Sequence, residues 1–197
     1  IWRNDRRHWR TGTAAAHCGI AARNSTGPGP LAGNLRAHRG VRNAVGFFDA
    51  SPLYKYEITG RDAEQFLSGL LARDIRTCRP GRAQYTIWCD DAGYVLEDGV
   101  VFRHSANEFL LTAAEPNLSF LQTQTGSLDV AVEDVSQQFA MLAVQGPRSR
   151  AALADLAPEV NQLGYFGHAQ SKIAGSEVTV SRTGFTGDLG FELRIPA

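Results

Sequence analysis

Long apolar runs, cysteine and methionine are all scarce in this sequence. No stretch reaches the roughly 18 apolar residues that a membrane-spanning helix requires, and the N-terminus lacks the apolar core of a signal peptide. The three cysteines, Cys18, Cys78 and Cys89, are scattered and form no Cys-x-x-Cys pair, so neither a disulfide framework nor a cysteine-ligated metal site is indicated. We therefore expect a protein of a reducing, cytoplasmic compartment without a membrane partner or a metal centre.

Charge is distributed unevenly, although the formal net charge is zero. Residues 1–43 hold eight arginines and one acidic residue, giving +7, whereas residues 44–197 hold 12 basic and 19 acidic residues, giving −7. A basic arm can bind nucleic acid by neutralising phosphates, but this arm has no lysine and no helical periodicity. We interpret residues 1–40 as a basic leader, disordered or non-native, and expect no nucleic-acid partner. Residues 41–197 form the predicted folded region.

Neither end of the chain resembles a natural terminus. The chain begins at Ile1, its single methionine is Met141, and it stops at "GFELRIPA" directly after a predicted strand. We therefore expect a fragment of a longer protein.

Strand and helix patterns are interleaved from Ala44 onward. Residues 53–59 alternate as a half-buried strand does, and "GRDAEQFLSGLLAR" places apolar residues at helical spacing. Further strands are predicted at 83–89, 94–102, 108–114, 138–146 and 190–195, a hairpin at 171–183, and helices at 116–124 and 147–156. Because hairpins join several strand pairs, the pattern predicts an α+β fold with mixed, mostly antiparallel sheets and packed helices.

Two adjacent carboxylates interrupt the predicted strand "YVLEDGVVF" (Tyr94–Phe102). In a strand, Asp98 shares one face with Phe102, whereas Glu97 shares the other face with Val101. Both faces are largely apolar, so alternation does not decide which carboxylate points inward. A buried carboxylate must be hydrogen-bonded, paired or neutralised. The pair is either a hydrogen-bonded feature of the sheet end, which the pattern alone favours, or a chemical centre.

A second candidate is the stretch "SRTGFTGDLGFEL" (Ser181–Leu193), which holds three glycines between two predicted strands. Its spacing does not match a nucleotide-binding fingerprint, and taken alone it indicates a decorated turn in which Glu192 has apolar neighbours. "AVQGPRSR" similarly indicates a strand-to-helix turn. The five histidines show no metal-ligand spacing, and each is expected at the surface or in a turn.

Taken together, four stretches resemble the family of folate-dependent aminomethyltransferases. They are "AVGFFDASPLYKYEITGRDAEQFL", "PGRAQYTIWCDDAGYVLEDGVVF", "AVQGPRSR" and "SRTGFTGDLGFEL". The resemblance runs from about residue 41 to residue 196, and it implies the folate-binding aminomethyltransferase fold. It also implies tetrahydrofolate as cofactor and transfer of a one-carbon unit, of the kind that the glycine-cleavage T-protein performs. A small one-carbon donor and a lipoyl carrier protein are the partners it implies.

The resemblance assigns roles to individual residues. Asp98 matches the second Asp of the family's hairpin and is the expected catalytic residue, and Glu97, which stands in place of the first, is an expected cofactor-binding residue. Tyr85 and Glu192 match positions that line the folate site, where Glu192 is expected to pair with the pterin. Two further expected cofactor-binding residues replace a more usual Tyr, namely Phe185 and Phe102.

Departures from the family pattern lie on the substrate side. Ala114, within "TAAEPN", replaces an Asn beside the ligand, and "FDASPLYKY" differs from the T-protein's Phe-Asp-Val-Ser-His-Met-Gly. Two alternatives to aminomethyl transfer therefore stay open. One is a folate-dependent demethylase of an N-, O- or S-methyl compound, and the other is a non-catalytic folate-binding module.

Overall fold

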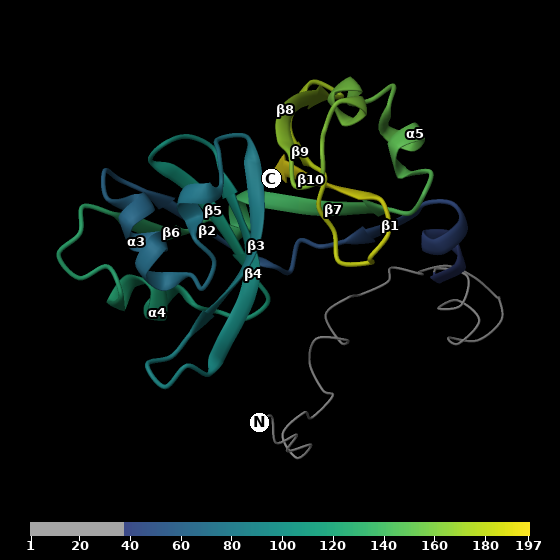
Figure 1. Cartoon of the computed structure of the whole chain (residues 1–197). Helices are drawn as coiled ribbons and strands as arrows, with labels where there is room; N and C mark the ends of the chain where they lie inside the picture. The colour runs from purple at the N-terminus through teal and green to yellow at the C-terminus, as the bar shows by residue number, and fades with distance from the viewer. Residues whose placement is uncertain (1–37) are drawn as a thin grey trace, which may run out of the picture.

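The structure is a computed structural model that describes residues 38–197. Most of the basic leader predicted for residues 1–40 lies outside the described residues, and its boundary at residue 41 stays a prediction. Within 38–197 the chain forms two five-stranded antiparallel sheets that face each other, with short helices on their outer surfaces (Figure 1). The predicted α+β class with antiparallel sheets is therefore confirmed.

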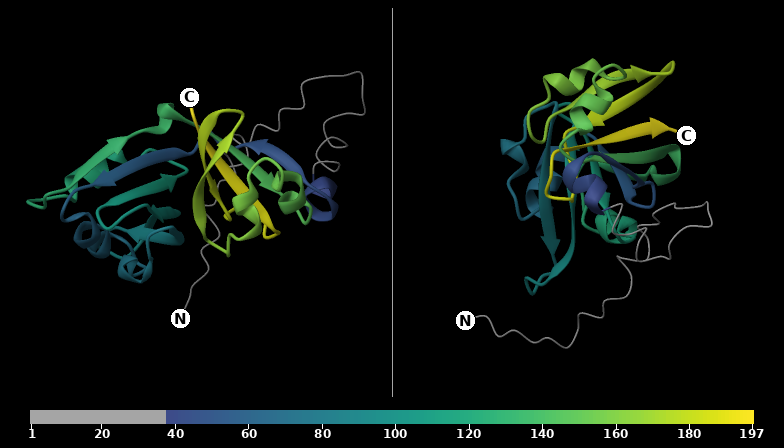
Figure 2. Two further views of the ribbon diagram at one scale, coloured as in Figure 1. Left: turned by 90° about the horizontal axis from the view of Figure 1, so that it is seen from above. Right: turned by 90° about the vertical axis from the view of Figure 1, so that its right-hand side faces the viewer.

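The chain starts one sheet, builds the second completely, and then returns to finish the first. The first sheet has the strand order β1-β7-β10-β9-β8, and the second sheet has the order β3-β4-β5-β2-β6. The strands are β1 (Gly46–Asp49), β2 (Tyr54–Thr59), β3 (Arg82–Cys89), β4 (Val95–Arg103), β5 (Glu108–Ala113), β6 (Ala131–Asp134), β7 (Phe139–Gln145), β8 (His168–Ile173), β9 (Ser176–Ser181) and β10 (Gly190–Pro196). Figure 2 shows the two sheets as separate layers that the chain connects.

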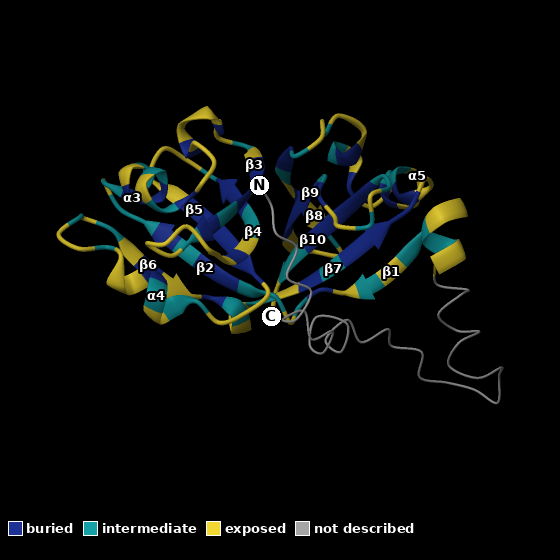
Figure 3. Ribbon diagram, turned by 60° about the horizontal axis from the view of Figure 1, so that its bottom comes forward, coloured by how far each residue is buried: buried dark blue, intermediate teal, exposed yellow. Residues whose placement is uncertain are grey.

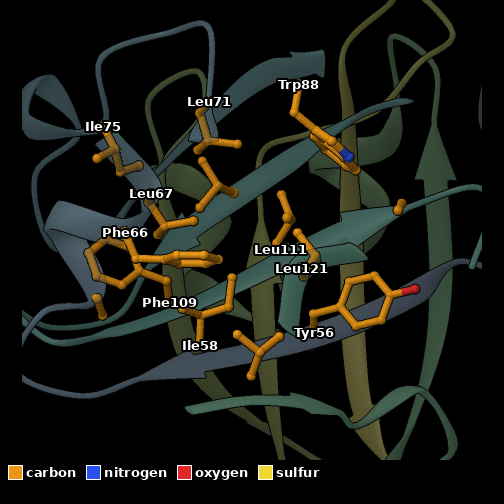
Figure 4. Close-up of a cluster of buried hydrophobic side chains, with 14 of the residues drawn as sticks. Tyr56, Ile58, Phe66, Leu67, Leu71, Ile75, Trp88, Phe109, Leu111 and Leu121 are labelled. Atoms are coloured by element: carbon orange, nitrogen blue, oxygen red, sulfur yellow. The ribbon is translucent and has the colours of Figure 1, made fainter. Parts of the chain in front are cut away.

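Two helices, α3 (Ala63–Leu70) and α4 (Leu118–Thr123), cover the outer face of the second sheet. On α3 the buried residues Ala63, Phe66 and Leu67 recur at helical spacing, which gives the helix one apolar face. They pack against sheet residues such as Trp88 and Leu111 in one hydrophobic cluster (Figure 4). Because the helices cover this outer face, the opposite, inner face of the sheet is the one that meets the first sheet.

The first sheet has its own core on its outer face. Helix α5 (Ser149–Leu153) and the 3-10 turn η3 (Pro158–Asn161) contribute Leu153 and Val160, which pack against Phe191 of β10. Figure 3 colours most of the central strands β5 and β10 as buried. The inner face of the first sheet carries the alternate residues of β10, Glu192 among them.

Lys55 is fully buried where the chain passes from the first sheet to the second. Its Nζ donates hydrogen bonds to the carbonyls of Ser51 (3.0 Å) and Leu53 (2.8 Å). Burial lowers the pKa of Lys55, and the charges of Asp134 and Asp49 oppose that shift. The ammonium therefore stabilises the conformation of the connection between β1 and β2.

Three elements differ from the sequence prediction. Strands β1 and β6 were not predicted, because each has only four residues and β6 reads "AVED", in which Val132 alone is buried. Helix α5 is shorter than the predicted 147–156 and begins after Pro147. Both differences arise where the apolar pattern is short and tertiary pairing decides the structure.

Gly99 provides a test of the β4–β5 register beside the acidic pair. A Cβ at this position would lie 1.9 Å from the backbone carbonyl oxygen of Thr112. We expect Gly99→Ala to lower the free energy of unfolding by about 1–3 kcal/mol in a denaturant titration, because the sheet must open to admit the methyl group. The control is Gly69→Ala on α3, where no atom lies within 4 Å and a gain of up to about 1 kcal/mol is expected. Unchanged stability of Gly99→Ala would contradict the register.

Candidate functional site

Glu97 and Asp98 point to opposite faces of the second sheet. Glu97 is buried, and its carboxylate accepts hydrogen bonds from the backbone N–H groups of Asp98 (2.9 Å) and Glu115 (2.8 Å). Asp98 is exposed and shares the inner face of the sheet with Phe102. Glu97 therefore holds the end of β5 against β4, whereas Asp98 is available to a ligand.

Tyr85 lies beside Asp98 on the same inner face. It pairs in register with Val100 on the adjacent strand, and its side chain is 48% exposed. The Asp98 carboxylate, followed by desolvation and then by the charge of Asp98, raises the pKa of the Tyr85 hydroxyl. Tyr85 is therefore a neutral phenol at neutral pH and can donate to the carboxylate or to a ligand held by it.

Glu192 is a buried carboxyl without a cationic partner. Its Oε2 accepts a hydrogen bond from the Thr183 hydroxyl, which in turn contacts the Ser181 hydroxyl at 2.7 Å. Burial raises the pKa of Glu192, and the Thr183 bond opposes this shift. Among the described residues no Lys or Arg forms an ion pair with it, and its Oε1 accepts no hydrogen bond. One oxygen of a desolvated carboxyl is thus left for N–H donors of a ligand.

Residues of both sheets meet around Glu192. Phe102 and Leu110 of the second sheet line a small cavity opposite Ser181 and Arg194 of the first. Phe102 is 5% exposed and packs in a cluster with Leu110. On β4, Asp98 lies four residues from Phe102, or about 13 Å of strand. A ligand that touches both Asp98 and Glu192 must therefore be elongated.

Phe185 is the predicted site residue that lies farthest into solvent. It is 69% exposed, and its ring meets the ring of Phe48 edge-on, with 5.4 Å between centroids. The structure thus brings Tyr85 to Asp98 and places Phe102 at the cavity of Glu192. It does not bring Phe185 or Glu97 to either pair.

Gln145 is a positioning residue that the sequence pattern did not single out. Its side chain is fully buried, donates to the carbonyl of Thr183 (3.1 Å) and accepts from the Thr186 hydroxyl (3.0 Å). A Cβ on Gly184 or Gly190 would lie 2.1 or 1.9 Å from that side chain. The glycines of the loop therefore make room for a buried amide, which fixes Thr183 and through it Glu192. Only the Gln-Gly-Pro stretch itself could have pointed to this residue.

The expectation that every histidine lies at the surface or in a turn is wrong for His168. This residue begins β8, is 9% exposed, and its ring Nε2 donates to the carbonyl of Arg103 at 3.1 Å. The ring of His104 packs edge-on against it, with 5.0 Å between centroids. A backbone hydrogen bond from His168 to the carbonyl of Gly81 and an isolated bridge between Arg82 and Gly167 bring His168 against β3. No local sequence pattern encodes these long-range contacts.

The half-buried imidazole of His104 predicts a loss of stability in acid. Burial, then the charges of Arg194 and His168, lower its pKa from 6.5 to about 4. A base whose pKa is lower in the folded than in the unfolded state contributes its full stabilisation at pH values above the unfolded-state pKa. That contribution is lost as the pH falls from the unfolded-state pKa to the folded-state pKa. We expect roughly 3 kcal/mol to be lost between pH 6.5 and 4 and His104→Gln to reduce this slope in denaturant titrations. The exposed His38→Gln serves as control, and identical slopes in wild type and His104→Gln would contradict the assignment.

The described residues contain no group of three His, Cys, Asp or Glu side chains arranged to hold a metal ion. None of the helices in residues 38–197 has the length and apolarity needed to cross a membrane. The polar groups that the site does present are carboxyl, phenol and hydroxyl groups.

Comparison with known proteins gives consistent matches. The family described as "GCVT N-terminal domain" matches residues 31–197. An aminomethyltransferase of Caldanaerobacter subterraneus is 37% identical over 168 residues, which is 82% of this chain and 45% of that protein. One of Desulfitobacterium hafniense is 33% identical over 174 residues, covering 86% of this chain and 48% of that protein. The chain therefore spans about half the length of the curated relatives it matches.

Solved structures show the same fold. The glycine cleavage system aminomethyltransferase T of Bartonella henselae superimposes with a TM-score of 0.73 at 26% identity, covering 82% of this chain and 45% of that one. A heterotetrameric sarcosine oxidase from Corynebacterium superimposes with a TM-score of 0.55 at 20% identity over 88% of this chain and 87% of that one. The second likeness concerns the fold alone.

Proposed function

The chain belongs to the GCVT N-terminal domain family, and from that premise we propose that it is the folate-binding part of a tetrahydrofolate-dependent aminomethyltransferase of the glycine-cleavage T-protein type. The observation that carries the proposal is the buried, cation-free carboxyl of Glu192, which keeps one oxygen for a ligand. Because the chain matches about half of its relatives' length, catalysis is proposed for the whole protein. A cytoplasmic location, expected from the scarce cysteines, is part of the proposal.

Glu192 anchors the pterin in this proposal. Its carboxylate accepts the amino and ring N–H groups of the pterin as two charge-assisted hydrogen bonds, which are roughly twice as strong as neutral ones. Thr183 holds the carboxylate in place, and the aromatic ring of Phe102 covers the neighbouring wall. Phe185 is proposed to stack on the folate from the loop in which it is exposed.

Asp98 is proposed to act at the reacting end of the ligand, with Tyr85 beside it. When bound, tetrahydrofolate supplies the nitrogen that accepts the one-carbon unit. The Asp98 carboxylate orients the N–H of that amine and stabilises the positive charge that develops during transfer. The Tyr85 hydroxyl is proposed to donate a hydrogen bond to Asp98 and so to orient its carboxylate. A lipoyl carrier protein is the proposed source of the aminomethyl group.

One observation favours a second candidate, a folate-dependent demethylase. Glu97 binds the backbone N–H of Glu115, so the stretch 112–117 that departs from the family pattern is held directly beside Asp98. Ala114 is exposed in this stretch, where the family pattern has an amide side chain. A smaller side chain next to the reacting end suits a methylated donor of different shape.

The experiment that tests the proposal is a transfer assay with the protein, tetrahydrofolate and an aminomethyl-loaded lipoyl carrier. We expect 5,10-methylenetetrahydrofolate and ammonia as products. Product from methylated amines, ethers or thioethers instead, with none from the carrier, would assign the demethylase. Tetrahydrofolate binding without turnover of any donor would contradict the enzyme and assign a binding module.

A further inference from the structure

Beyond Phe102, at the end of β4 opposite to Asp98, the two sheets enclose a second hollow of about 580 Å³. Ligand sites for small molecules commonly have this size. The second sheet contributes Glu57 and Glu108 to its lining, and the first sheet contributes Arg194 and Glu177. The hollow thus holds charges of both signs.

Arg194 forms the inner wall of this hollow and is incompletely paired. Its Nη2 contacts the ring Nε2 of His104 at 3.2 Å and donates to the Thr179 hydroxyl at 3.1 Å. Because a guanidinium can only donate, His104 must be the acceptor, hence a neutral imidazole. The Nε of Arg194 is buried and has no acceptor within the described chain, and the guanidinium stacks on the Phe139 ring, 5.1 Å from its centroid.

The carboxylates of the hollow stay apart from this cation. None of Glu57, Glu108 and Glu177 forms an ion pair with Arg194 within the described residues, although the charges of Glu57 and Glu108 act on its pKa. The glutamates are exposed or half-buried and are therefore solvated, whereas the buried Nε of Arg194 has no acceptor within the described residues. A ligand that carries both charges satisfies the two sides at once.

We propose that this hollow binds a zwitterionic α-amino acid. The ligand's carboxylate accepts the free N–H groups of Arg194, and its ammonium group donates to the glutamate carboxylates at the rim. The Phe139 ring beneath the guanidinium and the neutral His104 hold Arg194 in place without competing for the ligand's carboxylate. The hollow adjoins the proposed pterin contacts, because Thr179 and Arg194 also line the cavity of Glu192.

The test is a thermal-shift screen of the protein with the common L-α-amino acids at millimolar concentration. A ligand that binds only the folded state raises the melting temperature with concentration. Butyrate and n-butylamine, which carry one charge each, are the matched probes. At least one amino acid is expected to stabilise the protein saturably, and the single-charge probes are expected to bind at least about tenfold more weakly, since each loses one charged hydrogen-bonding group.

Variants locate the binding site. Arg194→Gln and Glu108→Gln are each expected to weaken the amino acid's affinity by about tenfold or more, whereas the exposed Arg73→Gln leaves it unchanged. Glu108 is exposed, so its variant tests the site even if Arg194→Gln fails to fold. The proposal is overturned if no amino acid binds, if the single-charge probes bind equally well, or if both variants bind normally. Displacement of the bound amino acid by tetrahydrofolate also overturns the proposal. If the protein binds an amino acid but not tetrahydrofolate, only the proposed function is contradicted.

Discussion

Asp98→Asn is expected to reduce the rate of one-carbon transfer by about 10²–10⁴-fold, with tetrahydrofolate affinity changed by no more than a few-fold. The substitution keeps the size of the side chain and its place on the inner face, but it removes the negative charge. Asn cannot stabilise the cation that develops on the substrate nitrogen, and it loses the ionised acceptor that orients the N–H group. Binding survives because Glu192, on the other sheet, anchors the pterin.

Two controls separate this effect from a structural one. Asp91→Asn changes an exposed aspartate in the β3–β4 hairpin and is expected to leave transfer unchanged. Glu97→Gln removes a carboxylate that accepts two backbone N–H groups, and we expect it to lower stability more than Asp98→Asn does. Normal turnover by Asp98→Asn, measured with saturating donor and folate, would show that this carboxylate takes no part in transfer.

Glu192→Gln is expected to weaken tetrahydrofolate binding by roughly 10–100-fold, the value of one or two hydrogen bonds to a charged group. The carbonyl oxygen of Gln can still accept the Thr183 hydrogen bond, but the other terminal atom is then an NH2 donor, which offers the pterin neither an acceptor nor a charge. The same substitution at the exposed Glu133 is the control and should leave binding unchanged. Equal affinity of Glu192→Gln and wild type would remove Glu192 from the folate site.

The protonation of Glu192 gives this prediction a second, independent readout. Burial raises the pKa of Glu192 in the free protein, and hydrogen bonds from the pterin favour the ionised form and lower that pKa again. Folate binding should therefore release a proton at pH values between the bound-state and free-state pKa. Calorimetry in two buffers of different ionisation enthalpy measures the release, which Glu192→Gln abolishes.

The same raised pKa also affects stability. An acid whose pKa is higher in the folded than in the unfolded state destabilises the fold as the pH rises from the unfolded-state pKa to the folded-state pKa. Glu192→Gln should therefore be more stable than wild type at pH values above the unfolded-state pKa, while binding folate less well. Stability is lost at this position in exchange for a ligand contact, as is common at binding sites.

Sequence patterning predicted the β3–β4 hairpin well, because its signals are local. Asp90 accepts hydrogen bonds from the backbone of Ala92 (3.0 Å) and Tyr94 (2.8 Å) within the turn. The faces of Glu97 and Asp98 could not be predicted, because both faces of β4 carry apolar residues. Only the packing of α3 against one face and of the first sheet against the other distinguishes them.

The parts of the candidate site that depend on contacts between residues far apart in the sequence could not be predicted from local sequence patterns. Gln145 pairs with a loop 38 residues further along the chain, and Arg194 meets His104 across 90 residues. In neither case do the neighbouring residues in the sequence indicate the long-range contact. Gly184 and Gly190 are glycines because the buried amide of Gln145 leaves no room for a Cβ at either position. A motif for nucleotide binding does not describe such a packing constraint. Folate as the ligand was predicted from the resemblance to the family and not from the residue patterns.

The most direct test of the central claim is a calorimetric titration of the protein with reduced tetrahydrofolate, run beside Glu192→Gln. The account predicts saturable one-site binding, with proton release in wild type and at least about tenfold weaker binding in the variant. No binding by a protein that unfolds cooperatively, or equal binding by both proteins, would contradict the account.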